Sequence, residues 1–161
     1  MRQGRVEVSA EIEAQPQEIY AVVADYRNGH PRILPEEYLR DLEVEAGGYG
    51  AGTVIRFRVR AFGIERQARA TVSEPEPGRV LVETEMTSNI VTTYTLTAQS
   101  EGKTTLQITS AWQISRNPFV ALQQAFYPKL MRSMDAKELE LIAAFVSSKK
   151  TSEGIEPLFT H

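Results

Sequence analysis

The order of the hydrophobic patterns predicts an α+β fold, in which a curved antiparallel sheet surrounds one long C-terminal helix. An alternating strand comes first, and a short helical stretch follows it. Further alternating segments joined by tight turns predict an antiparallel meander. The chain then closes on an amphipathic helical pattern at residues 118–147. A sheet wrapped around a single helix leaves room for a pocket between them, and we expect function to reside there.

The N-terminal part is expected to hold one strand and two short helices. Val6, Val8, Ala10 and Ile12 alternate with polar residues, which is the period of a strand with one solvated face. The proline at position 16 suits the first turn of a helix, which the apolar spacing extends to residue 25. Asn, Gly and Pro at residues 28–31 end that helix, and a second short helix is expected over residues 33–39.

Six more strands are expected, at residues 41–46, 53–61, 64–73, 79–86, 90–98 and 104–114. Their alternation assigns every second side chain to the concave face of the sheet. Hydroxyl groups on such a face are costly unless they are satisfied, so several together indicate a pocket that holds water or a polar ligand group. The concave residues that we expect to line a pocket are Phe57, Arg66, Thr84, Met86, Thr92, Tyr94, Ser110 and Trp112.

The last helix begins with a favourable N-cap, because Asn117 precedes a proline at the first helical position. A second proline, Pro128, interrupts the pattern and predicts a kink near residue 125. The apolar stripe that should face the sheet consists of Phe119, Leu122, Phe126, Leu130, Met134, Leu141 and Phe145.

Composition excludes several functional classes. With no cysteine, the chain has neither disulfides nor thiolate-bound metals. A net charge of −3 argues against a nucleic-acid partner, and no apolar run reaches the length of a membrane span. We therefore expect a cytoplasmic protein without an integral membrane segment, built as one domain at residues 1–148 followed by a tail at residues 149–161.

Two turns carry a family resemblance. Gly-Ala-Gly-Thr at residues 50–53 leads into an arginine-flanked strand, and Glu-Gly-Lys-Thr at residues 101–104 opens the last strand. With the order of the elements, these turns resemble the polyketide cyclase/dehydrase and lipid transport branch of the START-like, Bet v 1-like (SRPBCC) superfamily, over about residues 5–148. The resemblance implies a helix-grip fold, with seven strands around an apolar cavity. It implies no cofactor and no catalytic residue, because the superfamily shares no catalytic motif.

Two polar residues of the expected pocket have alternative interpretations. His30 is the one internal histidine, so it cannot build a multi-histidine metal site. The resemblance places its segment near the cavity mouth, where it is either a ligand contact or acid/base group, or simply part of a turn. Arg66 points inward if its strand keeps register, and it could then anchor a ligand carboxylate. The alternatives are a register bulge or an exposed strand end.

Two other features are interpreted as structural. The glycine-rich segment at residues 47–52 opens a strand rather than a helix, so it is a hairpin turn and not a dinucleotide loop. Arg56, Arg58 and Arg60 occupy one strand face, which we expect to be convex and paired with Glu83 and Glu85.

The favoured function is binding or carriage of a hydrophobic or amphipathic small molecule, such as a lipid, a quinone or an aromatic polyketide. The alternatives are an aromatase/cyclase-like or dehydratase-like enzyme that uses the same cavity, and a protein-interaction module with an apolar tail patch at Ile155, Leu158 and Phe159. We expect a monomer or weak homodimer. The expected ligand-binding residues are the eight concave strand residues with His30, Leu122, Phe126, Leu130 and Met134. If Phe126 packs in a dry core, Phe126→Ala should cost about 3 kcal/mol.

Overall fold

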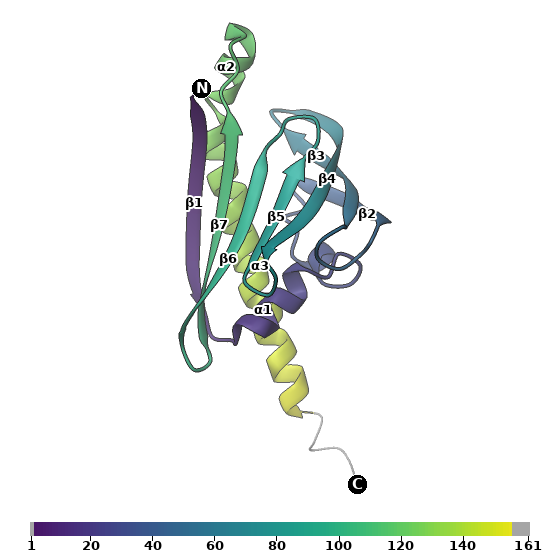
Figure 1. The fold of residues 1–161 in the computed structure, drawn as a ribbon, viewed down its shortest axis with the longest axis vertical. Helices are drawn as coiled ribbons and strands as arrows, with labels where there is room; N and C mark the ends of the chain where they lie inside the picture. The colour runs from purple at the N-terminus through teal and green to yellow at the C-terminus, as the bar shows by residue number, and fades with distance from the viewer. Residues whose placement is uncertain (1, 156–161) are drawn as a thin grey trace.

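The computed structural model describes residues 2–155, with side chains to residue 152, and it confirms the predicted helix-grip fold. One antiparallel sheet holds seven strands, and a long helix runs along it (Figure 1). The strands are β1 Gln3–Ile12, β2 Leu39–Ala46, β3 Val54–Ala61, β4 Ile64–Glu76, β5 Val80–Glu85, β6 Val91–Ser100 and β7 Lys103–Gln113. The helices are α1 Pro16–Val23, the 3₁₀ turn η1 His30–Arg32, α2 Pro118–Gln124 and α3 Tyr127–Ile155.

The sheet is a meander closed by its first strand, in the order β1-β7-β6-β5-β4-β3-β2. Because neighbouring strands are antiparallel, alternate turns lie at the same end of the sheet. The β3–β4 turn, the β5–β6 turn and the start of β1 therefore lie at the end where β7 leads into α2. In Figure 1 this end is uppermost, and α2 stands beyond the strands.

The core lies between the concave face of the sheet and helices α1 and α3. Its most deeply buried members include Ile19 of α1, Ile55 and Leu81 of the sheet, and Ile142 of α3, all of them buried. A smaller cluster of Val6, Trp112 and Met131 lies apart from it. The core therefore fixes the face that α3 turns toward the sheet.

One strand presents the face opposite to the one predicted. In β5, Leu81 pairs with Tyr94 and Glu83 pairs with Thr92. Paired residues share a face of the sheet, so the odd-numbered side chains of β5 point inward. Thr84 and Met86 accordingly lie on the other side, and Met86 is half exposed. The expectation that they belong to the concave face was wrong, because β5 is apolar on both faces at its start and its pattern does not fix the register.

The inward register of β5 also changes the partners of the convex arginines. Arg56 pairs with Glu43, and Arg58 lies 3.7 Å from Asp41 and 3.8 Å from Glu65. The predicted convex face is therefore confirmed for these arginines. The predicted pairing with Glu83 and Glu85 was wrong, because both glutamates face the interior.

The C-terminal helix is interrupted where the second proline predicts a kink. The α2 helix ends at Gln124 and α3 starts at Tyr127, one residue before Pro128. As predicted, Asn117 caps α2, since its side chain accepts a hydrogen bond from the Phe119 amide. The apolar stripe is correct only in part. Met134 is buried, and Leu130, Leu141 and Phe145 are partly buried, but Phe119, Leu122 and Phe126 are exposed because α2 projects past the sheet.

Two boundaries also differ from prediction. The second short helix is the three-residue turn at His30–Arg32, and residues 33–38 form bends and turns that lead into β2. The last helix continues to Ile155, beyond the expected end at residue 147. The predicted apolar tail patch lies outside the described side chains. Within residues 2–155, no helix is both long and apolar enough to cross a membrane.

Candidate functional site

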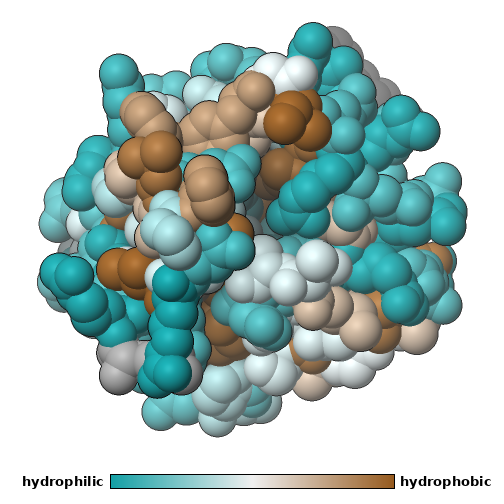
Figure 2. Space-filling model, turned by 90° about the horizontal axis from the view of Figure 1, so that it is seen from above, coloured by the Kyte–Doolittle hydropathy of each residue, from teal (hydrophilic) through white to brown (hydrophobic). Residues whose placement is uncertain are grey.

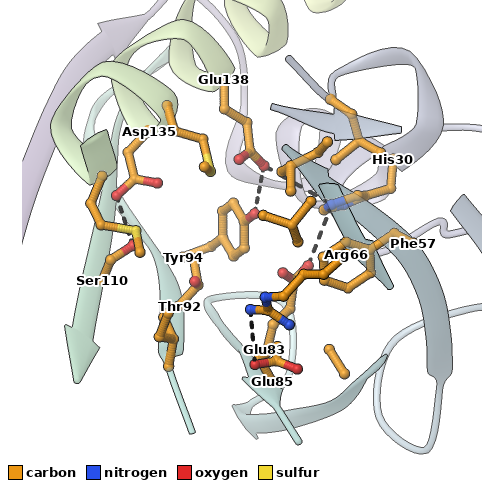
Figure 3. Close-up of a pocket in the computed structure, with 17 residues that line it drawn as sticks. His30, Phe57, Arg66, Glu83, Glu85, Thr92, Tyr94, Ser110, Asp135 and Glu138 are labelled. Atoms are coloured by element: carbon orange, nitrogen blue, oxygen red, sulfur yellow. Dashed lines mark hydrogen bonds and ion pairs between the residues drawn. The ribbon is translucent and has the colours of Figure 1, made fainter. Parts of the chain in front are cut away.

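A cavity of about 100 Å³ lies between the sheet and α3, and we call it the inner cavity (Figure 3). A second space of about 110 Å³, the outer chamber, extends toward the α2 end. Five residues line both spaces: Val59, Arg66, Ile90, Met131 and Met134. The remaining lining of the inner cavity is His30, Leu34, Leu39, Phe57, Ala70, Glu83, Glu85, Thr92, Tyr94, Ser110, Asp135 and Glu138.

His30 is placed by the tight turn that follows α1. Its backbone amide donates to the carbonyl of Asp25 at 2.7 Å. The turn needs glycine at position 29, because a Cβ there would lie 2.4 Å from the carbonyl oxygen of Val22. The imidazole stacks on the ring of Tyr26, with ring centroids 4.5 Å apart, and is almost completely buried. The histidine predicted to lie at a mouth is therefore part of the interior.

The hydrogen bonds of His30 define its chemistry. Nδ1 lies 2.8 Å from the carbonyl oxygen of Val23, and a carbonyl only accepts, so Nδ1 carries a proton. Nε2 faces the cavity side, 3.4 Å from Glu83 Oε1 and 4.0 Å from Glu138 Oε1. Nε2 is therefore the ring nitrogen that faces the carboxyl groups of the cavity.

Two tyrosines orient the same carboxylates. The Tyr26 hydroxyl donates to Glu83, and the Tyr94 hydroxyl donates to Glu138, both at 2.5 Å. Burial and the nearby carboxylate charges raise the pKa of both tyrosines well above their usual range, so the hydroxyls remain protonated donors. These four residues with His30 form what we call the polar cluster, and Figure 3 shows His30, Glu83, Tyr94 and Glu138 converging.

Burial also changes the acidity of the helical carboxyl groups. The pKa of Glu138 is raised well above its usual range, first by burial and then by the charge of Glu83. Burial likewise raises the pKa of Asp135 to about 6, although a 2.7 Å hydrogen bond from Ser110 lowers it. The cavity thus holds carboxyl groups that retain protons under conditions where exposed carboxyls lose them.

Arg66 lines the cavity, which is the orientation expected if its strand keeps register. Its guanidinium lies 3.5 Å from Glu85. Burial opposes ionisation of Glu85, but hydrogen bonds from Ser88 and Thr87, with the charge of Arg66, lower its pKa overall. Arg66 is partly exposed, with 41% of its side chain accessible, and Glu85 is its ionic partner at the edge of the cavity.

The structure brings together eight of the predicted ligand-binding residues. His30, Phe57, Arg66, Thr92, Tyr94, Ser110 and Met134 line the inner cavity, and Leu130 lines the outer chamber. The other five lie elsewhere. Trp112 packs in the smaller cluster, Thr84 and Met86 lie on the other side of the sheet, and Leu122 and Phe126 are exposed.

Sequence reasoning missed the carboxyl groups of the site, which are Glu83, Glu85, Asp135 and Glu138. A signal existed for the helical pair. Asp135 and Glu138 share the helical face of Met131, Met134 and Ile142, at steps of three and four residues. An acidic side chain within an apolar stripe must be buried with a partner or face a cavity. Among the side chains described, those of residues 2–152, no group of three or more His, Asp or Glu is arranged to hold a metal ion.

Comparison with solved structures gives the same fold. KanY protein (ms6282) aligns with a TM-score of 0.78 and 24% identity, over 91% of this chain and 99% of that one. TTHA0849 from Thermus thermophilus aligns at 0.73 and 19%, over 91% and 99%. Zhui aromatase/cyclase from Streptomyces sp. R1128 aligns at 0.73 and 15%, over 91% and 94%. These similarities show the fold alone.

No curated protein matches this chain in sequence. The family model described as polyketide cyclase / dehydrase and lipid transport matches residues 3–145. Because that match spans all seven described strands and most of α3, the chain belongs to the polyketide cyclase / dehydrase and lipid transport family.

Proposed function

We propose that this protein binds an amphipathic small molecule, with its apolar body in the outer chamber and its polar end in the inner cavity. The observation that carries the proposal is the polarity gradient along the two spaces. The shared region is lined mainly by Val59, Ile90, Met131 and Met134, whereas the far part of the inner cavity meets the polar cluster. A mostly apolar pocket with a few convergent polar groups is typical of a small-molecule site.

The volumes favour a modest ligand. Spaces of about 100 and 110 Å³ suit a single ring or a short chain with one polar group. A diacyl lipid is larger than these spaces. Of the ligand classes expected from the sequence, a compact aromatic molecule therefore fits this structure best.

The charges of the inner cavity favour a ligand end that donates hydrogen bonds. Four carboxyl groups line it, against one arginine and one histidine. Arg66 is already paired with Glu85, so it offers little to a ligand carboxylate. A ligand carboxylate beside Glu83 would add like-charge repulsion in a low-dielectric space. An alcohol, phenol or amine is therefore favoured over an acid.

Matched six-carbon probes test this proposal. We expect hexanol and hexylamine to bind roughly tenfold more tightly than hexanoate, as measured by NMR shift titration at pH 7. Ala70→Val should weaken binding of both favoured probes, because Ala70 lines the inner cavity. The control is Thr71→Val, on the exposed side of the same strand. Tightest binding of hexanoate, or equal binding by the two variants, would contradict the proposal.

A second function, an aromatase/cyclase-like or dehydratase-like enzyme, is favoured by one specific observation. His30 Nε2 lies within 4.0 Å of a glutamate whose pKa is raised, so a base and a protonated acid are adjacent. In such a reaction, Nε2 would take a proton from a substrate carbon. Glu138 or Tyr94 would donate a proton to the developing oxyanion or the departing oxygen.

Turnover of a poly-β-keto substrate tests the enzymatic alternative. We expect Tyr94→Phe to lower kcat about 100-fold, because the hydroxyl that orients Glu138 is lost. Tyr38→Phe is a matched control, since its hydroxyl is not part of the cavity lining. Wild-type turnover no faster than the uncatalysed reaction would leave the binding function alone. The interaction-module alternative stays a prediction, tested by partner capture after deletion of residues 150–161, which removes Ile155, Leu158 and Phe159.

A further inference from the structure

The end of the molecule that carries α2 exposes an unusual set of large apolar side chains. Phe119 is 84% exposed, Leu122 66%, Ile64 62%, Phe126 59% and Phe62 45%. Figure 2 views this end from above, and brown and tan side chains gather on part of it. We call these five residues the α2-end patch. Exposed aromatic and branched side chains on this scale mark an interaction surface.

The patch is continuous with the outer chamber. Phe62 forms ring contacts with Phe126, at 6.3 Å between centroids, and with Tyr127, at 6.2 Å. Phe62 of the β3–β4 turn and Ile64 at the start of β4 line the chamber together with Tyr127. A surface that covers the patch would therefore also cover the route toward the inner cavity.

The segment that contains α2 and the start of α3 carries only basic charges. No acidic residue occurs between Glu101 and Asp135, although the whole chain has a net charge of −3. Arg116, Lys129 and Arg132 are exposed in this segment, and no ion pair involves them within the described residues. Of the acidic residues near the β3–β4 turn, Glu65 lies beside Arg58 and Glu85 beside Arg66. The patch is thus apolar with a basic margin.

We propose that the α2-end patch docks on an anionic lipid surface. Short segments with exposed Phe and Leu beside Lys and Arg are typical of the membrane interface, where rings enter the headgroup region and cations meet lipid phosphates. A second copy of this chain fits less well. A two-fold interface would bring the same patch from both copies together, and the basic margins would repel each other. Docking goes beyond the proposed ligand binding and does not depend on it.

Vesicle co-sedimentation of the full chain tests the proposal. We expect binding to vesicles of phosphatidylglycerol and phosphatidylcholine in equal parts, and about tenfold weaker binding to phosphatidylcholine alone. The double variant Phe119→Ser/Leu122→Ser should lose about tenfold or more in partitioning. Both side chains are exposed, so its melting temperature should stay unchanged. Lys129→Gln/Arg132→Gln should weaken binding to the anionic vesicles alone, as added salt should.

The control is Tyr49→Ser, which removes an exposed apolar side chain at the α1 end. Its binding should equal that of the wild type. Equal binding to neutral and anionic vesicles, or no loss in the Phe119→Ser/Leu122→Ser variant, would overturn the proposal. So would a stable dimer, seen by light scattering, that this variant dissociates while vesicle binding is absent. That result would assign the patch to self-association.

Discussion

Asp135→Asn is expected to raise the free energy of unfolding at pH 8 by as much as about 3 kcal/mol, and to change it little near pH 3. Burial raises the pKa of Asp135 from 3.8 to about 6 in the folded protein. Each pKa unit corresponds to about 1.4 kcal/mol, and the shift spans about two units. At a pH above both pKa values, the ionised carboxylate therefore lowers the free energy of unfolding by as much as about 3 kcal/mol. Asparagine has a similar shape and does not ionise.

The sign follows from proton binding. Between about pH 4 and 6, the folded state holds a proton on Asp135 that the unfolded state has released. The contribution of this group to stability is therefore fully present at low pH and is lost as the pH rises through about 6. Glu138 acts in the same direction, because its folded pKa is also raised. The wild type should show this loss in denaturant titrations across the range, and Asp135→Asn should reduce it.

Asp41→Asn is the matched control, since its carboxylate is largely exposed and lies 3.7 Å from Arg58. Its effect should be within about 0.5 kcal/mol at either pH. If Asp135→Asn lowers stability at pH 8, then the folded protein favours the ionised carboxylate. In that case the low-dielectric description of the cavity is wrong.

A stabilising variant at this position would have functional meaning. The chain maintains buried carboxyl groups where a neutral residue would fold better, which is the usual relation between stability and a binding or catalytic site. Asp135 has one hydroxyl partner, Ser110, and both side chains line the inner cavity. The loss of stability is therefore the cost of keeping polar groups in the cavity, where a ligand can reach them.

The sequence predicted the fold well because most strands have a single apolar face. Alternation with polar residues places Ile55 and Phe57 of β3, and Ile108 and Ser110 of β7, on the correct side. Register is specified where one face is clearly apolar, and β5 lacks that asymmetry. Only its pairing with Tyr94 shows that Leu81, and with it Glu83, faces inward.

Two further parts of the site depend on tertiary structure. The sequence alone does not distinguish a buried glutamate from an exposed one. Glu83 in an alternating strand is therefore expected to be a surface partner of the arginines, although the structure turns it inward. The helical stripe was extended through α2 on periodicity alone. The break between Gln124 and Tyr127 places α2 beyond the end of the sheet. The apolar side chains of α2 therefore do not pack against the strands and stay exposed.

Ile142→Ala is expected to destabilise the protein by about 3 kcal/mol, whereas Phe126→Ala should cost about 0.5 kcal/mol or less. Ile142 has no exposed surface and belongs to the main core, so its truncation loses buried apolar area and leaves a cavity. Phe126 is 59% exposed, and its ring centroid lies 6.3 Å from that of Phe62. The sequence pattern predicts a cost of about 3 kcal/mol for Phe126→Ala in a dry core, so denaturant unfolding of the two variants separates the two helix orientations.

This comparison also tests the site, because Ile142 lies on the same helical face as Asp135 and Glu138. Glu138 precedes Ile142 by four residues and Asp135 precedes it by seven, so the three side chains point the same way from α3. A large loss for Phe126→Ala together with a small loss for Ile142→Ala would mean that α3 is rotated. The two carboxyl groups would then face solvent, and the polar cluster would lose the acid next to His30. The expected result instead keeps Ile142 in the core, and the same helix orientation holds Glu138 against Tyr94.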